Sequence, residues 1–202
     1  MARPAGTVSI ARSRILSCAS DLFYRKGINH VGVNEIIEAS GVARMTLYHH
    51  FKSKNDIISA VLDMRRARRL EGIQVSMQEA DTPRGRILAI FDYLDRVIDD
   101  PGFRGCAFIN AAVELADPAH PGFEISMRHK RRMIEEFERI AAQAGWRAPD
   151  LFALQCQLLW DGAVAAAQIG YDDAPVRAAR AALETLIDAA ESGAARRAGE
   201  QP

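Results

Sequence analysis

Residues 35–54 read EIIEASGVARMTLYHHFKSK and decide the fold of the N-terminal part of the chain. An apolar-periodic segment containing Ile36 runs into Gly41, and a second short segment follows with Leu47 and Phe51. Residues four apart lie on the same face of a helix. The pattern therefore predicts two short helices joined by a tight turn at a glycine, which is the layout of a helix-turn-helix.

The second helix of a helix-turn-helix lies in the major groove of DNA. Leu47 and Phe51 would face the protein interior, which leaves the rest of the helix surface able to reach phosphates and base edges. We therefore predict that this segment recognises DNA. The predicted contact residues, which include two lysines just beyond the helix, are Arg44, Met45, Thr46, Tyr48, His49, His50, Lys52 and Lys54.

Single residues of this surface permit finer predictions. Arg44 is the best candidate for a base contact, because arginine pairs bidentately with guanine, although a phosphate contact fits as well. His50 either contacts a phosphate or packs against another helix. Lys52 and Lys54 flank Ser53, the predicted start of the next helix, where the helix dipole disfavours cations. A phosphate bound there would resolve that conflict.

The charge distribution also separates the N-terminal third from the rest. The formal net charge is zero, yet residues 1–69 hold 12 Lys and Arg against 5 Asp and Glu, and residues 70–202 hold 14 against 21. A basic segment that carries a helix-turn-helix pattern indicates a polyanionic partner. A solvated charged face would give the same count.

Helical periodicity continues along the chain, and no segment reads as a strand hairpin. We predict an all-α fold of about nine helices. The expected helices cover residues 9–26, 33–40, 43–51, 53 to 72 or 77, 82–99, 103–116, 122–144, 149–169 and 175–190. The expected division is an N-terminal DNA-binding domain at 1–52 that begins with a disordered arm at 1–8, a C-terminal ligand-binding and dimerisation domain at 53–191, and a disordered tail at 192–202.

The last two long helices carry a prediction about assembly. Residues 149–169 are apolar nearly all round, and a helix of this kind must be covered on more than one side. Residues 175–190 are rich in alanine, which permits close approach of helices. Self-association through these two helices is therefore expected.

Several classes of protein find no support in the sequence. There is no glycine-rich phosphate loop, GxSxG or HExxH motif, so we expect neither an enzyme nor a cofactor. Asp117, His120 and His129 lack the spacing of metal ligands. No signal peptide or membrane-spanning run is found, and three scattered cysteines fit a reducing compartment, which predicts a cytoplasmic protein.

The residues of the helix-turn-helix resemble the TetR family of bacterial transcriptional repressors. The matching positions are Gly27, Ile36, Ala39, Gly41, Val42, Thr46, Tyr48, His50, Phe51 and Lys54. The sequence departs from the commonest pattern in two ways. Val31 and Gly32 replace the usual hydroxyl-bearing helix cap, and Met45 stands where a small residue is more common and could read a thymine methyl group.

The resemblance implies a three-helix DNA-binding domain, a linking fourth helix, and a C-terminal domain with a ligand cavity that dimerises through its last two long helices. It implies that Thr46, Tyr48 and His50 contact phosphates or bases, and that Lys54 contacts a phosphate. Asn110 and Glu114 form a polar pair within an apolar helix. The predicted ligand-binding residues are Phe91, Phe108, Asn110, Glu114, Met133, Phe137 and Trp160. Plain core packing of the aromatics and a helix-to-helix hydrogen bond of the polar pair are the alternatives.

We therefore predict a ligand-responsive transcriptional regulator that binds a palindromic double-stranded DNA operator as a homodimer. A repressor released by an unidentified small molecule is the leading interpretation, and activation is open. The alternative is an all-α small-molecule-binding protein or enzyme that keeps the N-terminal domain only as a scaffold. A dimerisation protein without an effector is the third possibility.

Overall fold

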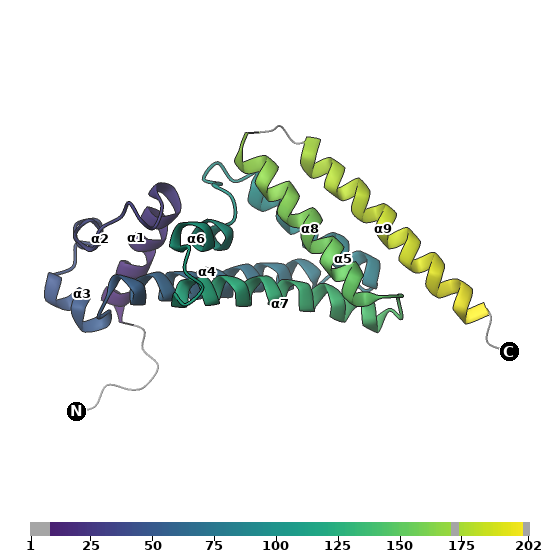
Figure 1. Ribbon diagram of the computed structural model, residues 1–202, viewed down its shortest axis with the longest axis horizontal. Coiled ribbons are helices and arrows are strands. Elements are labelled where there is room, and N and C mark those ends of the chain that lie inside the picture. Colours follow the sequence, from purple (N-terminus) through teal and green to yellow (C-terminus); the bar gives the residue numbers. More distant parts are fainter. Residues whose placement is uncertain (1–8, 171–173, 200–202) are drawn as a thin grey trace, which may run out of the picture. The chain divides into compact units, whose positions relative to one another are not determined.

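The computed structural model describes residues 9–170 and 174–199, which form nine α-helices and no strand (Figure 1). The predicted arm at 1–8 and the last part of the predicted tail, 200–202, lie outside the described residues. The helices are α1 (Ile10–Lys26), α2 (Val33–Ser40), α3 (Arg44–His50), α4 (Lys54–Met77), α5 (Pro83–Ile98), α6 (Ala107–Leu115), α7 (Pro121–Gln143), α8 (Pro149–Gln168) and α9 (Ala174–Gly199). The predicted all-α fold is confirmed.

The chain divides into two compact units. Unit 1 consists of the chain up to Ala67 together with Ala107–Met127, and unit 2 consists of Arg68–Cys106 together with the chain from Arg128 onward. The predicted boundary after residue 52 differs from this division, because the first half of α4 and all of α6 belong to unit 1.

The core of unit 1 is built from the apolar faces of α1 to α4. The side chains of Ile15, Ile36, Leu47 and Ile57 have no solvent-exposed surface, so each of these four helices contributes a fully buried residue. Burial of a leucine or isoleucine side chain is worth roughly 1.5–3 kcal/mol. Arg65 of α4 donates a hydrogen bond to the Ser20 carbonyl oxygen at 3.0 Å, which adds a polar tie between α4 and α1.

The start of α4 is capped by a reciprocal pair of side chains. The Ser53 hydroxyl accepts a hydrogen bond from the Asp56 backbone N–H at 3.1 Å. The Asp56 carboxylate in turn accepts from the backbone N–H groups of Lys52 at 2.8 Å and of Ser53 at 3.1 Å. This is the geometry of a capping box, with aspartate in place of glutamate, and it confirms Ser53 as the predicted cap.

Removal of this cap tests its contribution to stability. We expect Ser53→Ala to lower the free energy of unfolding by about 0.5–2 kcal/mol, because the Asp56 N–H loses its acceptor. Chemical denaturation measures the loss. The control is Ser17→Ala, which replaces an exposed serine inside α1 and should be neutral or slightly stabilising because alanine favours helix interiors. Equal stability of the Ser53 variant and the wild type would show that the cap contributes nothing.

The core of unit 2 is aromatic. The ring of Phe91 on α5 lies 6.3 Å from that of Phe137 on α7 and 5.9 Å, edge to face, from that of Trp160 on α8. Cys156, one turn before Trp160, is fully buried, and burial raises the pKa of its thiol to about 12. Cys156 is therefore protonated and unreactive at neutral pH.

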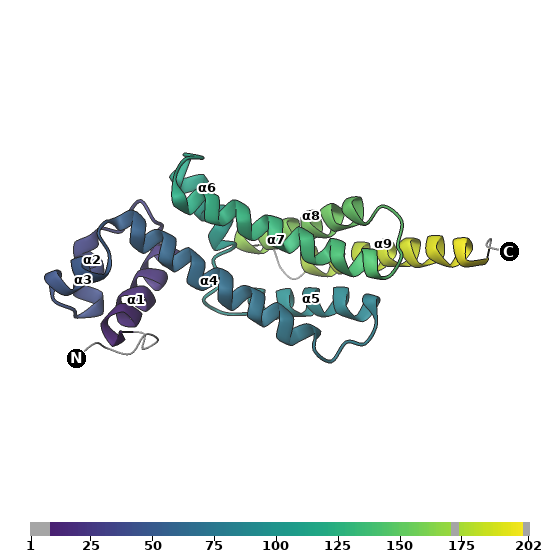
Figure 2. The ribbon, with the colours of Figure 1, turned by 90° about the horizontal axis from the view of Figure 1, so that it is seen from below.

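Two arginines form ion pairs between α5 and α9, one from each helix. Arg84 of α5 donates to the carboxylates of Asp188 at 2.6 Å and Glu191 at 3.1 Å on α9. Arg180 of α9 donates to Asp92 on α5. Since α9 also packs along α8 (Figures 1 and 2), three helices of unit 2 are held together at this side.

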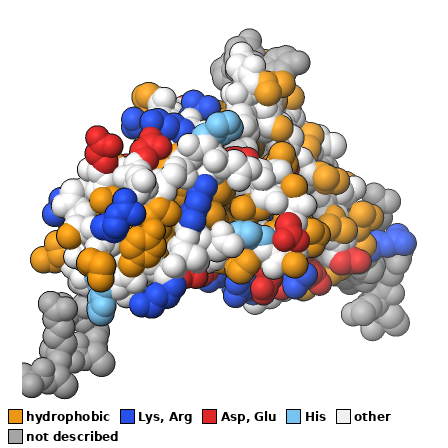
Figure 3. Space-filling view, turned by 60° about the vertical axis from the view of Figure 1, so that its left-hand side comes forward, with side chains coloured by type: hydrophobic (Ala, Val, Ile, Leu, Met, Phe, Trp, Pro, Cys, Tyr) orange, Lys and Arg blue, Asp and Glu red, His pale blue; other side chains and the backbone are white. Residues whose placement is uncertain are grey.

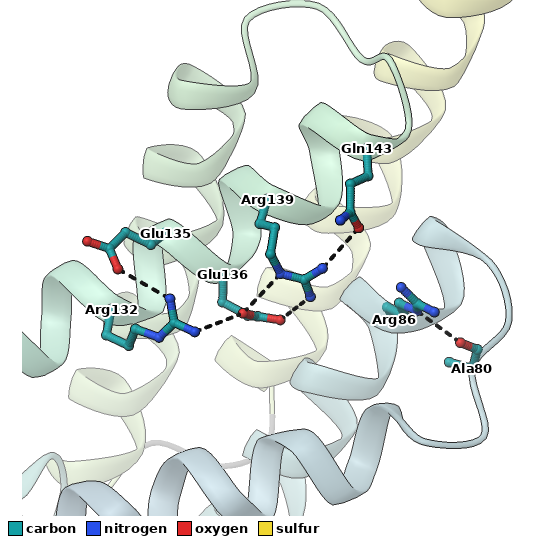
Figure 4. A network of polar contacts seen from close by, with 7 residues as sticks. All are labelled: Ala80, Arg86, Arg132, Glu135, Glu136, Arg139 and Gln143. Carbon is teal, nitrogen blue, oxygen red and sulfur yellow. Dashed lines mark hydrogen bonds and ion pairs between the residues drawn. The ribbon is translucent and has the colours of Figure 1, made fainter.

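The outer face of α7 carries a ladder of charged side chains (Figure 4). Glu136, whose side chain is only 12% exposed, lies between Arg132 at 3.8 Å and Arg139. The hydrogen bond with Glu136 raises the pKa of Arg139, which also donates to Gln143 at 2.9 Å. Pairs of this kind are worth little individually on an exposed helix. The ladder accounts for the polar side of α7, and its apolar side supplies Phe137 to the core.

The tail prediction requires a correction. The sequence predicts disorder from residue 192, whereas α9 continues to Gly199. The added segment contains several alanines and two arginines, which are strong helix formers and extend a helix that has already been nucleated.

Candidate nucleic-acid interface

The turn between α2 and α3 depends on Gly41. Its backbone is left-handed, with φ 61° and ψ 25°, and its N–H donates to the Ile37 carbonyl oxygen at 3.0 Å. Glycine adopts this conformation without the steric cost that a side chain would impose. A Cβ atom here would also lie 3.0 Å from the Arg14 guanidinium. The predicted glycine turn is confirmed, and it ends α2 so that α3 can begin at Arg44.

Helix α3 has one buried face and one exposed face. Leu47 is fully buried, whereas Met45 on the opposite side is 79% exposed. Arg44, Tyr48 and His49 are also exposed, and Thr46 and His50 are half-buried. The exposed face therefore offers a guanidinium, a phenol, an imidazole and an apolar side chain. Groups of these kinds can read phosphates and the major-groove edges of bases.

Arg44 is positioned by a neighbour that the sequence analysis missed. Its guanidinium donates to the side-chain oxygen of Asn34 on α2 at 2.7 Å. Arg44 is the first residue of α3, and the N-terminal residues of a recognition helix are those that contact base edges. Nothing in the sequence pairs residues ten apart across a turn, so only the structure reveals Asn34 as a positioning residue for this arginine.

His50 lies at the other end of α3 and is engaged within unit 1. Its Nε2 lies 3.3 Å from the hydroxyl oxygen of Ser9, next to the start of α1. The Arg12 guanidinium lies 5.3 Å from the centre of the Phe51 ring, just after α3. The packing role considered for His50 is therefore present in the structure, and its phosphate contact stays a prediction.

The two predicted lysine contacts stand in different surroundings from those expected. The ammonium group of Lys52 donates to the Tyr48 carbonyl oxygen at 3.3 Å, at the C-terminal end of α3, where the helix dipole favours a cation. The Asp56 carboxylate already places a negative charge at the start of α4. The dipole conflict inferred for Lys52 and Lys54 is therefore reduced inside the protein, and it no longer calls for a phosphate.

The surface over α1 to α3 has the mixed character of a DNA-binding face. Figure 3 shows Lys, Arg and His side chains interspersed with hydrophobic ones, and a few Asp and Glu side chains, on the part of the molecule that comes forward in this view. Lys26 is paired with Glu35 at 2.6 Å. The other residues of 1–69 still hold more Lys and Arg than Asp and Glu.

The predicted ligand-binding residues fall into separate units. Phe91, Met133, Phe137 and Trp160 are buried in the core of unit 2. Phe108, Asn110 and Glu114 lie on α6 in unit 1, where Phe108 is buried and the other two are half-buried. The aromatic residues thus form packed core, which was the alternative interpretation, and ligand binding by any of the seven stays a prediction.

Glu114 contacts the DNA-binding helices. Its carboxylate accepts a hydrogen bond from the Asn29 backbone N–H at 3.0 Å, and its carbonyl oxygen accepts from the Asn29 amide at 2.7 Å. Asn29 lies in the α1–α2 connection. Gly27, at the end of α1, has φ 90°, and a Cβ atom there would approach the Glu114 carboxylate to 2.9 Å. The alternative of a structural hydrogen bond therefore describes Glu114 in this structure.

The Glu114 contact leads to a second stability prediction. We expect Glu114→Ala to destabilise the protein by about 0.5–1.5 kcal/mol, because the Asn29 N–H loses its acceptor. Denaturant unfolding measures the change. The neighbouring Val113, 73% exposed, supplies the control Val113→Ala, which should change stability by less than about 0.5 kcal/mol. An unchanged midpoint for Glu114→Ala would mean that the contact is energetically neutral.

A glycine-turned helix pair with a buried inner face and an exposed, basic outer face on its second helix defines a DNA-binding protein of the helix-turn-helix class. Comparison with known proteins narrows the class. Residues 15–61 match the family described as bacterial regulatory proteins, tetR family. The structure superposes on SCO4454, a TetR-family transcriptional regulator from Streptomyces coelicolor, with a TM-score of 0.85, 30% identity and coverage of 90% of this chain and 96% of that one. The chain belongs to the TetR family, whose members are DNA-binding transcriptional regulators.

Two named relatives have opposite regulatory roles. The transcriptional repressor KstR2 of Mycobacterium tuberculosis is 25% identical over 156 residues, which are 75% of this chain and 76% of KstR2. The transcriptional activator FasR of Mycolicibacterium smegmatis is 30% identical over 97 residues, which are 46% of this chain and 43% of FasR. Both relatives are named as transcriptional regulators. Among the described residues, no helix is long and apolar enough to cross a membrane.

Proposed function

We propose that this chain is a homodimeric repressor that binds a near-palindromic operator and is released by a small molecule. The observation that carries the proposal is the exposed surface of α3, where Arg44, Met45 and Tyr48 are exposed while Leu47 is fully buried. Packing alone does not require a guanidinium and a phenol on that face. A DNA-binding role does, because both groups donate to phosphates or base edges.

The proposal of a dimer is supported by an apolar stripe on α8. The stripe consists of three leucines of α8, Leu151, Leu154 and Leu158, which expose about half or more of their surface at a spacing that keeps them on one side of the helix. Ile169, directly after the last residue of α8, is 74% exposed. Neighbouring exposed apolar residues of this kind mark interaction sites. A second copy of the chain is the occupant that we propose for this surface.

Helix α9 complements the stripe with small residues. The exposed positions of α9 include Ala178, Ala181, Ala182 and Ala189, which would let a partner helix approach closely. An open hollow of about 840 Å³ lies between α8 and α9, with Leu151 and Phe152 on one side and Leu186 and Ala189 on the other. A four-helix arrangement of α8 and α9 with the same helices of a partner would fill this hollow and cover the stripe.

Dimerisation would explain how a single short helix reads DNA specifically. Two recognition helices related by a twofold axis enter successive major grooves about 34–36 Å apart, so the operator is a near-palindrome. A small molecule that binds more tightly to a dimer with a different head spacing would shift the population toward that form and release the DNA. Repression is proposed over activation by analogy with KstR2, which matches this chain over the greater length.

A reporter assay tests the regulatory role. The DNA upstream of the chain's own gene is fused to a reporter in a host without the protein, and the protein is then supplied. We expect expression to fall with the wild type and to stay high with an Arg44→Ala, Tyr48→Ala double variant. Increased expression would make the protein an activator. No change with either protein would favour the scaffold alternative, in which the N-terminal domain does not bind this DNA.

A further inference from the structure

Gln157 of α8 is a buried amide with no hydrogen-bond partner in the part of the chain that the structure describes. The residue is only 5% exposed, and neither its Nε2 nor its Oε1 has a hydrogen-bond partner among residues 9–170 and 174–199. Buried polar groups in native proteins are almost always hydrogen-bonded, and an unpaired donor or acceptor carries the full cost of its desolvation. A side chain with both kinds of group unpaired therefore calls for a partner that the described part of the polypeptide does not supply.

The surroundings of Gln157 are apolar and aromatic. Trp160, one turn further along α8, contacts Phe91 of α5, and Phe91 contacts Phe137 of α7. Asp161, also one turn away, is paired with Lys130 of α7. The Gln157 amide therefore lies on the side of α8 that packs toward α5 and α7. The charges of Lys130 and Asp161 beside it neutralise each other.

We infer that Gln157 is the polar recognition group for the effector, and that the effector is a neutral, largely apolar molecule carrying a lactam or amide group. The inference rests on the proposed function, in which a small molecule releases the protein from its operator, and it places that molecule in unit 2. The amide presents a donor and an acceptor side by side in one plane. Glutamine uses this pair of atoms to bind the edge of adenine through two hydrogen bonds.

The same two atoms exclude other ligand classes. A ketone or an ester can only accept, so the Oε1 of Gln157 would stay unpaired. A carboxylate offers two acceptors and a net charge, whose burial is costly without a counter-ion. A lactam offers one donor and one acceptor at matching positions and satisfies both atoms of Gln157. The remainder of such a molecule would be apolar, as are Phe91 and Trp160.

Thermal melting of the full-length protein with a small panel of lactams tests the inference. The panel runs from δ-valerolactam to 2-quinolinone, each beside its N-methyl derivative, which keeps the shape and loses the donor. At ten times its dissociation constant a bound lactam should raise the melting temperature of the wild type by about 3–6 °C. The N-methyl partner should give a clearly smaller shift.

Two variants separate recognition from folding. Gln157→Met keeps the length of the side chain, should melt higher than the wild type without ligand because an unpaired amide is removed, and should lose the response to lactams. Gln143→Met makes the same change at an exposed position on α7 and should keep the response. Operator binding by each protein is measured in parallel.

The outcomes are distinguishable from those of the proposed function. A lactam response that is lost in Gln157→Met and kept in Gln143→Met supports the inference. Equal shifts from a lactam and its N-methyl form would overturn it, because the donor is then not read. A wild-type protein that binds its operator but whose melting temperature is raised by no lactam would also overturn the inference. That result would leave the DNA-binding function intact.

Discussion

Replacement of Leu158 by glutamate is expected to split the dimer and to weaken operator binding by about 100- to 10,000-fold, the avidity that linked binding provides over a single site. Leu158 is 71% exposed at the centre of the apolar stripe on α8. In the proposed dimer its side chain would be buried against the partner, where a carboxylate without a counter-ion is strongly unfavourable. Light scattering measures the mass, and a fluorescence anisotropy titration measures operator affinity.

The matched control introduces the same charge at a different exposed apolar residue. Val113 lies on α6 of unit 1 and is exposed to a similar degree, so Val113→Glu should leave the mass and the operator affinity unchanged. Helix content from circular dichroism should be equal in all three proteins, because Leu158 contributes little to the core of its own chain. A Leu158→Glu protein that remains dimeric would refute the proposed interface.

Arg44→Ala is expected to cost roughly 1–3 kcal/mol of binding free energy in each half-site and to relax sequence preference at one base pair. The physical reason is the bidentate fork of the guanidinium, which matches the two acceptors of guanine in the major groove. In the free protein Asn34 holds this guanidinium at 2.7 Å, so the side chain is already oriented at the start of α3. Affinities for a set of operators with single base changes measure the effect.

Arg44→Lys supplies the control for charge. Lysine keeps the positive charge and loses the planar fork, so it should restore part of the affinity and little of the specificity. If Arg44→Ala instead weakens binding equally for every operator, and also lowers the salt dependence, then Arg44 contacts a phosphate and does not read a base.

The helix-turn-helix was predictable because its determinants are local. Leu47 and Phe51 are one helical turn apart, so their spacing identifies the buried face of α3. Gly41 is the glycine between the two apolar segments, so it identifies the turn. The length of α9 was underestimated because residues 192–199 lack an apolar stripe. Their helical structure follows from propensity and continuation of the preceding turns, which periodicity does not detect.

The parts that could not be predicted depend on contacts between distant segments. The hydrogen bond from Asn29 to Glu114 joins residues 85 positions apart, and it places α6 with the DNA-binding helices instead of with unit 2. From the sequence, the polar pair Asn110 and Glu114 in an apolar helix is equally consistent with a ligand contact and with a hydrogen bond between helices. The unpaired amide of Gln157 is likewise invisible in a sequence, because burial and the absence of a partner are properties of the packed helices.

The most direct test of the central claim is the affinity of the purified protein for the DNA upstream of its own gene, measured by fluorescence anisotropy over a series of salt concentrations. Specific binding through a dimer with six to ten phosphate contacts should weaken by about 10³- to 10⁵-fold between about 50 and 200 mM salt. An unrelated duplex of equal length should bind far more weakly at every concentration. Equal affinity for both duplexes, or binding that does not respond to salt, would contradict the assignment of α3 as a DNA-recognition helix.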